Sequence, residues 1–194
     1  LGGPCEVSRR YENEGACVLR KKEDIVADTC AGAETIVGIF GEEKSLFARV
    51  NCAFMPYASS DAYNHKYPKL SEMTSFALRT LDKNFALVIS SDRIDHAAHT
   101  NKTKELAEEL AEFDRTVSAV LRWRRDRSEN AEIILLSDHE TDAQTLQHST
   151  VDVYAYSTNM DVRGRGLLQK NVPRILFPDA RFACVKTLSG GSNS

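Results

Sequence analysis

The sequence lacks the features of a nucleic-acid-binding or membrane-spanning protein. Its formal net charge is −3 and its pI is about 6.0, which gives no basic surface to bind a phosphate backbone. No apolar run approaches the roughly 18 residues that cross a lipid bilayer. A chain of 194 residues, of which 42% are hydrophobic and 27% charged, suits a single globular domain over residues 1–194.

Closely spaced cysteine pairs are also missing. None of the five cysteines belongs to a Cys-x-x-Cys pair, which argues against a cysteine-ligated zinc site. Four of the five lie in the first 52 residues, which fits disulfides formed in an oxidising compartment, although ordinary buried thiols explain them equally well. The cysteines are Cys5, Cys17, Cys30, Cys52 and Cys184. The glycosylation sequon Asn101-Lys102-Thr103 favours the oxidising compartment, and we expect a secreted glycoprotein that is extracellular, periplasmic or at the cell surface.

The apolar pattern predicts an α/β fold, with a mostly parallel sheet flanked by helices. Four segments are expected as strands: 36–40, 85–89, 132–136 and 151–156. Helical spacing of apolar residues predicts one helix after Pro68 and another from near Thr103. A helix between two parallel strands implies a right-handed crossover, which brings the ends of both strands to the same edge of the sheet.

The second predicted helix carries an apolar face and a charged face. Apolar residues recur at alternating spacings of four and three, so we expect this face to cover the sheet. They are Leu106, Leu110, Phe113, Val117 and Val120. The opposite face, which includes Glu109 and Glu112, is expected to be solvated.

Aspartate and histidine gather where two of the expected strands end. Asp95 and His99 follow the second strand on an expected loop, and Asp138 and His139 follow the third. In open α/β sheets, ligands bind beyond the carboxyl ends of the strands. A lone histidine is more often structural than a ligand, but carboxylate oxygens and imidazole nitrogens are zinc ligands. Asp–His pairs at two successive strand ends therefore favour a metal site.

His148 completes a set of five candidate ligands. One zinc ion takes three or four protein ligands, so five ligands suggest two ions. In phosphoryl-transfer sites, two metal ions clamp the attacking and the leaving oxygen. The sequence therefore predicts a two-metal site.

Several segments resemble the alkaline phosphatases, and they occur in the order of that family. They are Pro68–Thr74, Arg93–His99, Ser137–Thr141 and His148–Ser149, with Val151–Tyr156 behind them and weaker similarity at Val37–Phe40 and Gln169–Pro173. The resemblance is clearest over residues 36–184 and implies the C-terminal portion of an alkaline phosphatase-like α/β domain. Sulfatases, phosphodiesterases and cofactor-independent phosphoglycerate mutases share parts of the Asp–His pattern. The segments Pro68–Thr74 and Gln169–Pro173 favour the alkaline phosphatases over these relatives.

The resemblance implies hydrolysis of phosphate monoesters on two zinc ions. Asp95, His99 and His148 would hold the first ion, and Asp138 and His139 the second. His96 would contact the phosphate, at a position where the family carries a histidine or a lysine. In the family, a serine attacks phosphorus and a zinc-bound hydroxide then hydrolyses the phosphoserine, while the metals stabilise the charged oxygens of the transition state.

Parts of the family pattern are missing from this sequence. The Asp-Ser-Ala nucleophile motif is absent, together with a further zinc-binding aspartate and a substrate-clamping arginine upstream, so we expect the serine nucleophile to lie outside this chain. Ser90 stands where the family has a magnesium-binding glutamate, and a neutral serine is a poor magnesium ligand, which counts against Mg²⁺. The stretch before His148 is short, through either loss or omission of a longer insertion.

These departures determine the partners that we expect. A half-domain leaves a sheet edge and an apolar face uncovered, so the chain should be stable only with the N-terminal part of the same enzyme or with another subunit. The resemblance implies a homodimer. The alternative is a catalytically degenerate module that serves assembly or binding. Retention of all five candidate zinc ligands favours the enzyme.

Overall fold

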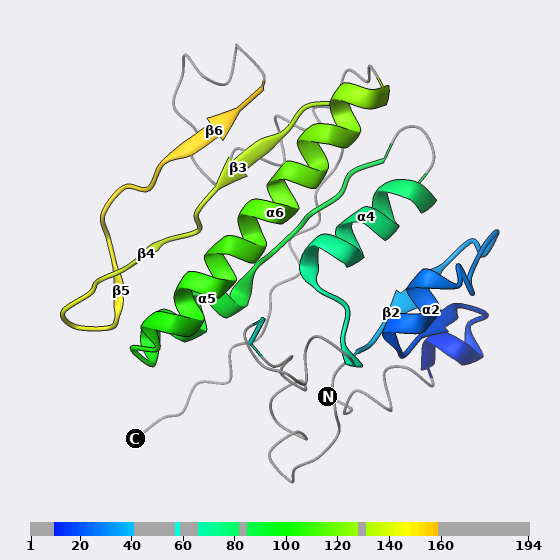
Figure 1. Ribbon diagram of the computed structural model, residues 1–194, viewed down its shortest axis with the longest axis horizontal. Helices are drawn as coiled ribbons and strands as arrows, with labels where there is room; N and C mark the ends of the chain where they lie inside the picture. The colour runs from blue at the N-terminus through cyan, green and yellow to red at the C-terminus, as the bar shows by residue number, and fades with distance from the viewer. Residues whose placement is uncertain (1–9, 41–56, 59–65, 82–84, 128–130, 159–194) are drawn as a thin grey trace, which may run out of the picture. The chain divides into compact units, whose positions relative to one another are not determined.

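The computed structural model describes residues 10–40, 57–58, 66–81, 85–127 and 131–158 (Figure 1). They belong to two compact units: unit 1 contains residues up to 130 together with 141–147, and unit 2 contains 131–140 together with the residues from 148 onward. Some features singled out in the sequence lie outside the described residues, namely the cysteines Cys5, Cys52 and Cys184 and the segment Gln169–Pro173. The organisation as a single domain stays a prediction.

A small parallel sheet and a short helix begin unit 1. The strands β1 (Cys17–Leu19) and β2 (Ile36–Gly38) pair in parallel, and the helix α2 (Lys22–Val26) lies between them in the chain. The Asp24 carboxylate accepts the N–H groups of Arg20 and Lys21 at 2.8 and 2.9 Å, and these bonds lower the pKa of Asp24. β2 confirms the strand predicted at 36–40, whereas no pattern in the sequence predicted β1.

A disulfide between Cys17 and Cys30 ties β1 to the turn that follows α2. For this pair the disulfide interpretation is confirmed over that of free thiols. Cys30 and Leu19 are each 2% exposed and belong to the core of unit 1. The core consists of Leu19, Ile25, Cys30, Phe40, Ala58, Tyr67 and Phe76. It therefore joins the small sheet to the segment that leads into the next helix.

Three helices pack together in unit 1 (Figure 1). The helices α4 (Leu70–Thr80) and α5 (Asp92–His99) both contact α6 (Thr103–Arg127). α4 and α6 confirm the two predicted helices. The expected loop around Asp95 was wrong, because α5 occupies it. Acidic residues fill its first turn and histidines its last turn, which suits the helix dipole, and Ala97 is fully buried.

The segment 85–89 is extended, but within the described residues it belongs to no sheet. Val88 is 89% exposed, so the prediction of a buried strand was wrong. A strand is held by hydrogen bonds to a neighbouring strand, and no described strand pairs with this one. The Phe85 ring instead meets the Trp123 ring of α6 edge-on, with 5.8 Å between ring centroids.

The buried face of α6 in unit 1 includes two carboxylates. Glu109 and Glu112 are 4% and 1% exposed, whereas Leu110 is 49% exposed, so the prediction of a solvated face was wrong at both glutamates. Their carboxylates accept the N–H groups of Ala58 at 2.7 Å and Ser71 at 2.9 Å, and these bonds compensate for lost hydration.

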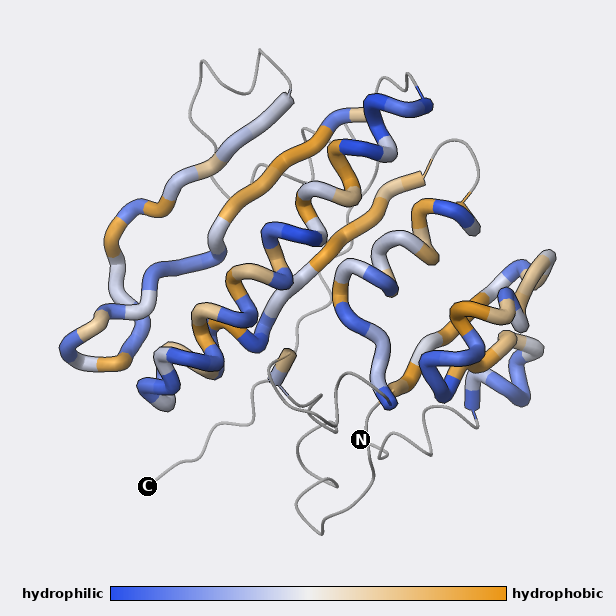
Figure 2. Tube along the Cα trace, in the orientation of Figure 1, coloured by the Kyte–Doolittle hydropathy of each residue, from blue (hydrophilic) through white to orange (hydrophobic). Residues whose placement is uncertain are grey.

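Hydrophilic and hydrophobic residues alternate along the whole of α6 (Figure 2). None of the described helices combines the length and the apolarity needed to cross a membrane.

Unit 2 contains a two-stranded antiparallel sheet. β3 (Ile134–Leu136) pairs with β6 (Ala155–Ser157), so that Ile134 lies opposite Ser157. β3 confirms the strand predicted at 132–136, and β6 confirms only the end of the strand predicted at 151–156. A further pair is formed by β4 (Glu140–Thr141) and β5 (His148–Ser149). The described residues thus combine helices with small sheets, and the large, mostly parallel sheet is not among them.

Candidate metal centre

The helix α5 presents a carboxylate and an imidazole on one face. Asp95 and His99 are separated by four residues, which places both side chains on the same side of the helix. His99 Nε2 lies 3.2 Å from Asp95 Oδ1, and both side chains are partly exposed. The sequence-predicted pair is therefore brought together within unit 1.

Both residues are oriented by further contacts in unit 1. Thr141 donates its hydroxyl hydrogen to Asp95 Oδ1 at 3.1 Å. His99 Nδ1 bonds to the backbone carbonyl oxygen of Leu146. A carbonyl only accepts, so the proton is on Nδ1. Metal-binding histidines characteristically donate the second ring N–H to such a partner, which leaves Nε2 for the metal.

The position of Leu146 has a conformational cost. Its φ is +57°, in the left-handed region that residues other than glycine rarely adopt. The turn is secured by the Asp142 carboxylate, which accepts the N–H groups of Gln144 and Thr145 at 3.0 and 2.7 Å. These bonds hold the pKa of Asp142 below its usual value. The turn thus holds the Leu146 carbonyl at the His99 ring.

The geometry of the pair formed by Asp95 and His99 favours a metal ion between the two side chains. With the proton on Nδ1, the lone pair of Nε2 would face a carboxylate oxygen, and two acceptors in contact repel each other. A metal ion bound to both atoms removes this repulsion. Two ligands about 2.0–2.1 Å from a tetrahedral zinc ion are about 3.3 Å apart. The observed separation of 3.2 Å suits that arrangement.

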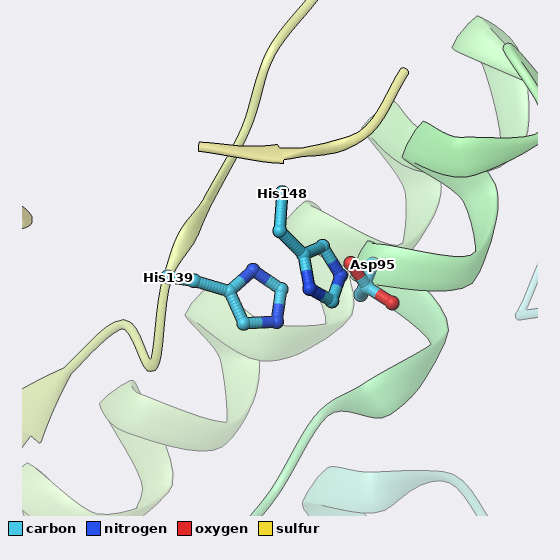
Figure 3. Close-up of side chains that lie close together, drawn as sticks. All are labelled: Asp95, His139 and His148. Carbon is cyan, nitrogen blue, oxygen red and sulfur yellow. The ribbon is translucent and has the colours of Figure 1, made fainter. Parts of the chain in front are cut away.

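A second group of candidate ligands lies in unit 2. His139 Nε2 is 3.3 Å from Asp138 Oδ2, close to the same ligand-to-ligand separation. The rings of His139 and His148 stack with 3.6 Å between centroids and 28° between planes (Figure 3). Among the described residues, His139 Nδ1 is buried without a hydrogen-bond partner. A buried, unpaired ring nitrogen is unfavourable in itself. His139 can bind a given ion through Nδ1 or through Nε2, but not through both.

The donor atoms fit zinc in kind. Asp95, His139 and His148 each offer one ligand atom, an oxygen or a nitrogen of the type that zinc accepts (Figure 3). In unit 2, the Ser137 hydroxyl donates to the His139 carbonyl at 2.6 Å. The predicted phosphate contact, His96, also lies on α5, but its Nδ1 pairs with the Tyr57 hydroxyl at 3.0 Å.

Sequence reasoning missed three residues that contact the candidate ligands or His96, the predicted phosphate contact. Thr141 ends the Ser137–Thr141 segment that resembles the alkaline phosphatases, and this position could have suggested a role near the ligands. Leu146 acts through its backbone carbonyl, so its side chain carries no signal. Tyr57 lies in an irregular stretch without periodicity, where nothing distinguished it from other loop tyrosines.

Comparisons with known proteins agree with the resemblance seen in the sequence. The alkaline phosphatase family profile matches residues 19–165. The tissue-nonspecific alkaline phosphatase of Gallus gallus is 37% identical over 82 residues, which cover 41% of this chain and 15% of that protein. The repressible alkaline phosphatase of Saccharomyces cerevisiae is 31% identical over 90 residues, or 42% of this chain and 16% of the relative. The alkaline phosphatase of Gadus morhua is 30% identical over 114 residues, which cover 57% of this chain and 21% of that protein.

The matched region is short beside these relatives. It spans 15%, 16% and 21% of their respective lengths. The family match nevertheless includes every candidate ligand, from Asp95 to His148.

Proposed function

This chain belongs to the alkaline phosphatase family, and from that premise we propose that it supplies metal-binding residues for the hydrolysis of phosphate monoesters. The observation that carries the proposal is the pairing of each aspartate with a histidine. The nitrogen-to-oxygen separations are 3.2 Å for Asp95 and His99 and 3.3 Å for Asp138 and His139. Both suit neighbouring ligands of a tetrahedral ion.

The proposed roles follow the family resemblance. Asp95, His99 and His148 hold one zinc ion, and Asp138 and His139 hold a second. When bound, zinc lowers the pKa of water and stabilises the negative oxygens of phosphoryl transfer. Thr141 and the Leu146 carbonyl keep Asp95 and His99 in place for binding. The exposed His96 contacts the phosphate, and the serine nucleophile comes from outside this chain.

The cellular setting forms part of the proposal. The disulfide between Cys17 and Cys30 supports an oxidising compartment, and therefore a secreted, periplasmic or cell-surface enzyme. Asn101 is exposed between α5 and α6 and is the proposed glycosylation site. The N-terminal part of the same enzyme, or another subunit, completes the active site. The complete enzyme is proposed to be a homodimer. Magnesium is not proposed, because the Ser90 hydroxyl is a poor ligand and donates a hydrogen bond to Asp92.

The first experiment measures zinc and activity together. Zinc bound per molecule is counted by mass spectrometry in the longest natural polypeptide that carries this chain, for the wild type, for Asp138→Asn and for the exposed control Asp152→Asn. We expect two ions in the wild type and the control, and loss of one ion in Asp138→Asn. Hydrolysis of an aryl phosphate at alkaline pH is then measured in the longest natural polypeptide that carries this chain, with zinc and with a chelator. Full activity without zinc, or unchanged zinc binding in Asp138→Asn, would overturn the proposal.

One observation favours a second candidate, a non-catalytic module. Ser90 occupies the position of a family metal ligand, and its hydroxyl is already engaged by Asp92. In such a module, zinc would remain bound to the polypeptide without turnover of the aryl phosphate. Binding of a partner would then survive Asp138→Asn even though zinc is lost.

A further inference from the structure

A cluster around Tyr57 adjoins the exposed imidazole of His96 in unit 1. The Tyr57 hydroxyl lies 3.0 Å from His96 Nδ1. Two cations lie near the phenol ring, with the Arg93 guanidinium 4.0 Å and the Lys102 ammonium 5.0 Å from its centroid. Such cation–π contacts hold a ring in place, because its face is electron-rich. Tyr57 is thus held by cation–π contacts on its ring, while its hydroxyl contacts His96.

The backbone that carries Tyr57 is itself anchored. The N–H of Ala58 donates to Glu109 Oε1 at 2.7 Å, and both residues are buried, at 8% and 4% exposure. Burial raises the pKa of Glu109, while the Ala58 N–H and the charge of Arg93 act in the opposite direction. Arg93 therefore contacts the Tyr57 ring and also stabilises the carboxylate that anchors the next residue. Glu109 lies on α6, which packs against the helix that carries His96.

From these contacts we infer that Tyr57 is a positioning residue for His96, an inference that rests on the proposed function. A phenol is the stronger donor of the two groups and an imidazole nitrogen the stronger acceptor, so the hydroxyl donates to Nδ1. The proton of the neutral ring is then on Nε2. This nitrogen presents an N–H donor to an anionic phosphoryl oxygen without a change of tautomer. The neighbouring charges of Arg93 and Lys102 favour an anion at the same place.

The variant Tyr57→Phe tests the inference because it removes the hydroxyl and keeps the ring. The tautomer of His96 is read from ring ¹⁵N chemical shifts in the zinc-free form of the longest natural polypeptide that carries this chain. We expect Nε2–H in the wild type and a mixture of tautomers in Tyr57→Phe. Inorganic phosphate is then titrated into the zinc-loaded polypeptide, and its affinity should fall about threefold to tenfold in the variant. Tyr11→Phe, on a partly exposed tyrosine, is the control and should change neither quantity.

A conservative exchange separates positioning from structural damage. Lysine at position 96 donates from a freely rotating ammonium and has no tautomer to fix. Tyr57→Phe should therefore leave phosphate affinity unchanged in a His96→Lys background. An equal loss in both backgrounds would overturn the inference, since it would show a general disturbance of the site.

The failures of the two proposals are distinguishable. If the wild-type polypeptide binds neither zinc nor phosphate, the proposed function fails, and the tautomer measurement alone decides the role of Tyr57. An unchanged tautomer in Tyr57→Phe overturns the inference. If zinc and phosphate bind as proposed but the variant matches the wild type in both measurements, the inference fails while the proposed function stands.

Discussion

Replacing Glu112 with glutamine tests whether a buried carboxylate holds α4 against α6. Glu112 Oε1 accepts the Ser71 N–H and Oε2 accepts the Arg115 Nε–H, each at 2.9 Å, while the side chain is only 2% exposed. A glutamine amide has one oxygen, so its NH₂ group must face one of these donors. The lost charge-assisted bond and the unpaired buried donor together predict a loss of about 2–3 kcal/mol in the free energy of unfolding.

The measurement is urea unfolding at neutral pH, followed by the fluorescence of Trp123, the single tryptophan of the chain. Glu108→Gln is the matched control, because Glu108 is exposed one helical turn earlier. The control should stay within about 0.5 kcal/mol of the wild type. Equal free energies of unfolding for Glu112→Gln and Glu108→Gln would refute the reasoning.

The same variant gives a test of pH dependence. Burial is the largest influence on Glu112 and raises its pKa, but the bonds from Ser71 and Arg115 outweigh burial, and the pKa is lowered overall. With the folded pKa below the unfolded value of about 4.3, the ionised carboxylate stabilises the fold above that pH. This stability is lost as the pH falls through the folded pKa. The difference between wild type and Glu112→Gln should shrink over that acidic range, and a constant difference would contradict the assignment.

Two further predictions concern unit 1. Glu109→Gln should show the opposite pH behaviour: burial raises the pKa of Glu109, so the wild type loses stability relative to the variant as the pH rises through the folded pKa, as measured by urea unfolding at several pH values. If the wild type instead gained stability relative to Glu109→Gln as the pH rises, the raised pKa of Glu109 would be excluded. Cys17→Ser should lower the free energy of unfolding by about 3 kcal/mol, because the disulfide joins Cys17 to Cys30, 13 positions further along the chain, and so closes a loop. The variant should not respond to reductant, whereas the wild type should.

Features with a regular period were predictable from the sequence. The helices α4 and α6 follow from apolar residues at helical spacing, and β3 follows from a short apolar run bounded by polar residues. The Asp–His spacing also pointed to Asp95 and His99 as candidate ligands, although the segment was expected to be a loop. Residues four apart come close together on one face of a helix, as they can in a loop. Local chemistry was therefore sufficient for these elements.

The rest depends on contacts between distant residues. Glu109 and Glu112 have the composition of a solvated face, and only the backbone N–H groups of Ala58 and Ser71 explain their burial. The segment 85–89 has the composition of a buried strand, yet a strand needs a neighbouring strand, which its own residues cannot specify. Tyr57 reaches His96 across 39 positions of sequence, a distance over which no periodic pattern extends.

The left-handed backbone at Leu146 has a consequence for how this region can vary. His99 is held by a carbonyl oxygen, an atom that every amino acid possesses, so selection at position 146 acts on backbone conformation and not on side-chain chemistry. Tolerance to substitution should then follow the ease of adopting a positive φ: glycine and asparagine would be accepted and β-branched residues rejected, whatever their hydrophobicity. Variation among leucine, asparagine and glycine would look like an absence of constraint, although the position supports His99, a proposed metal ligand.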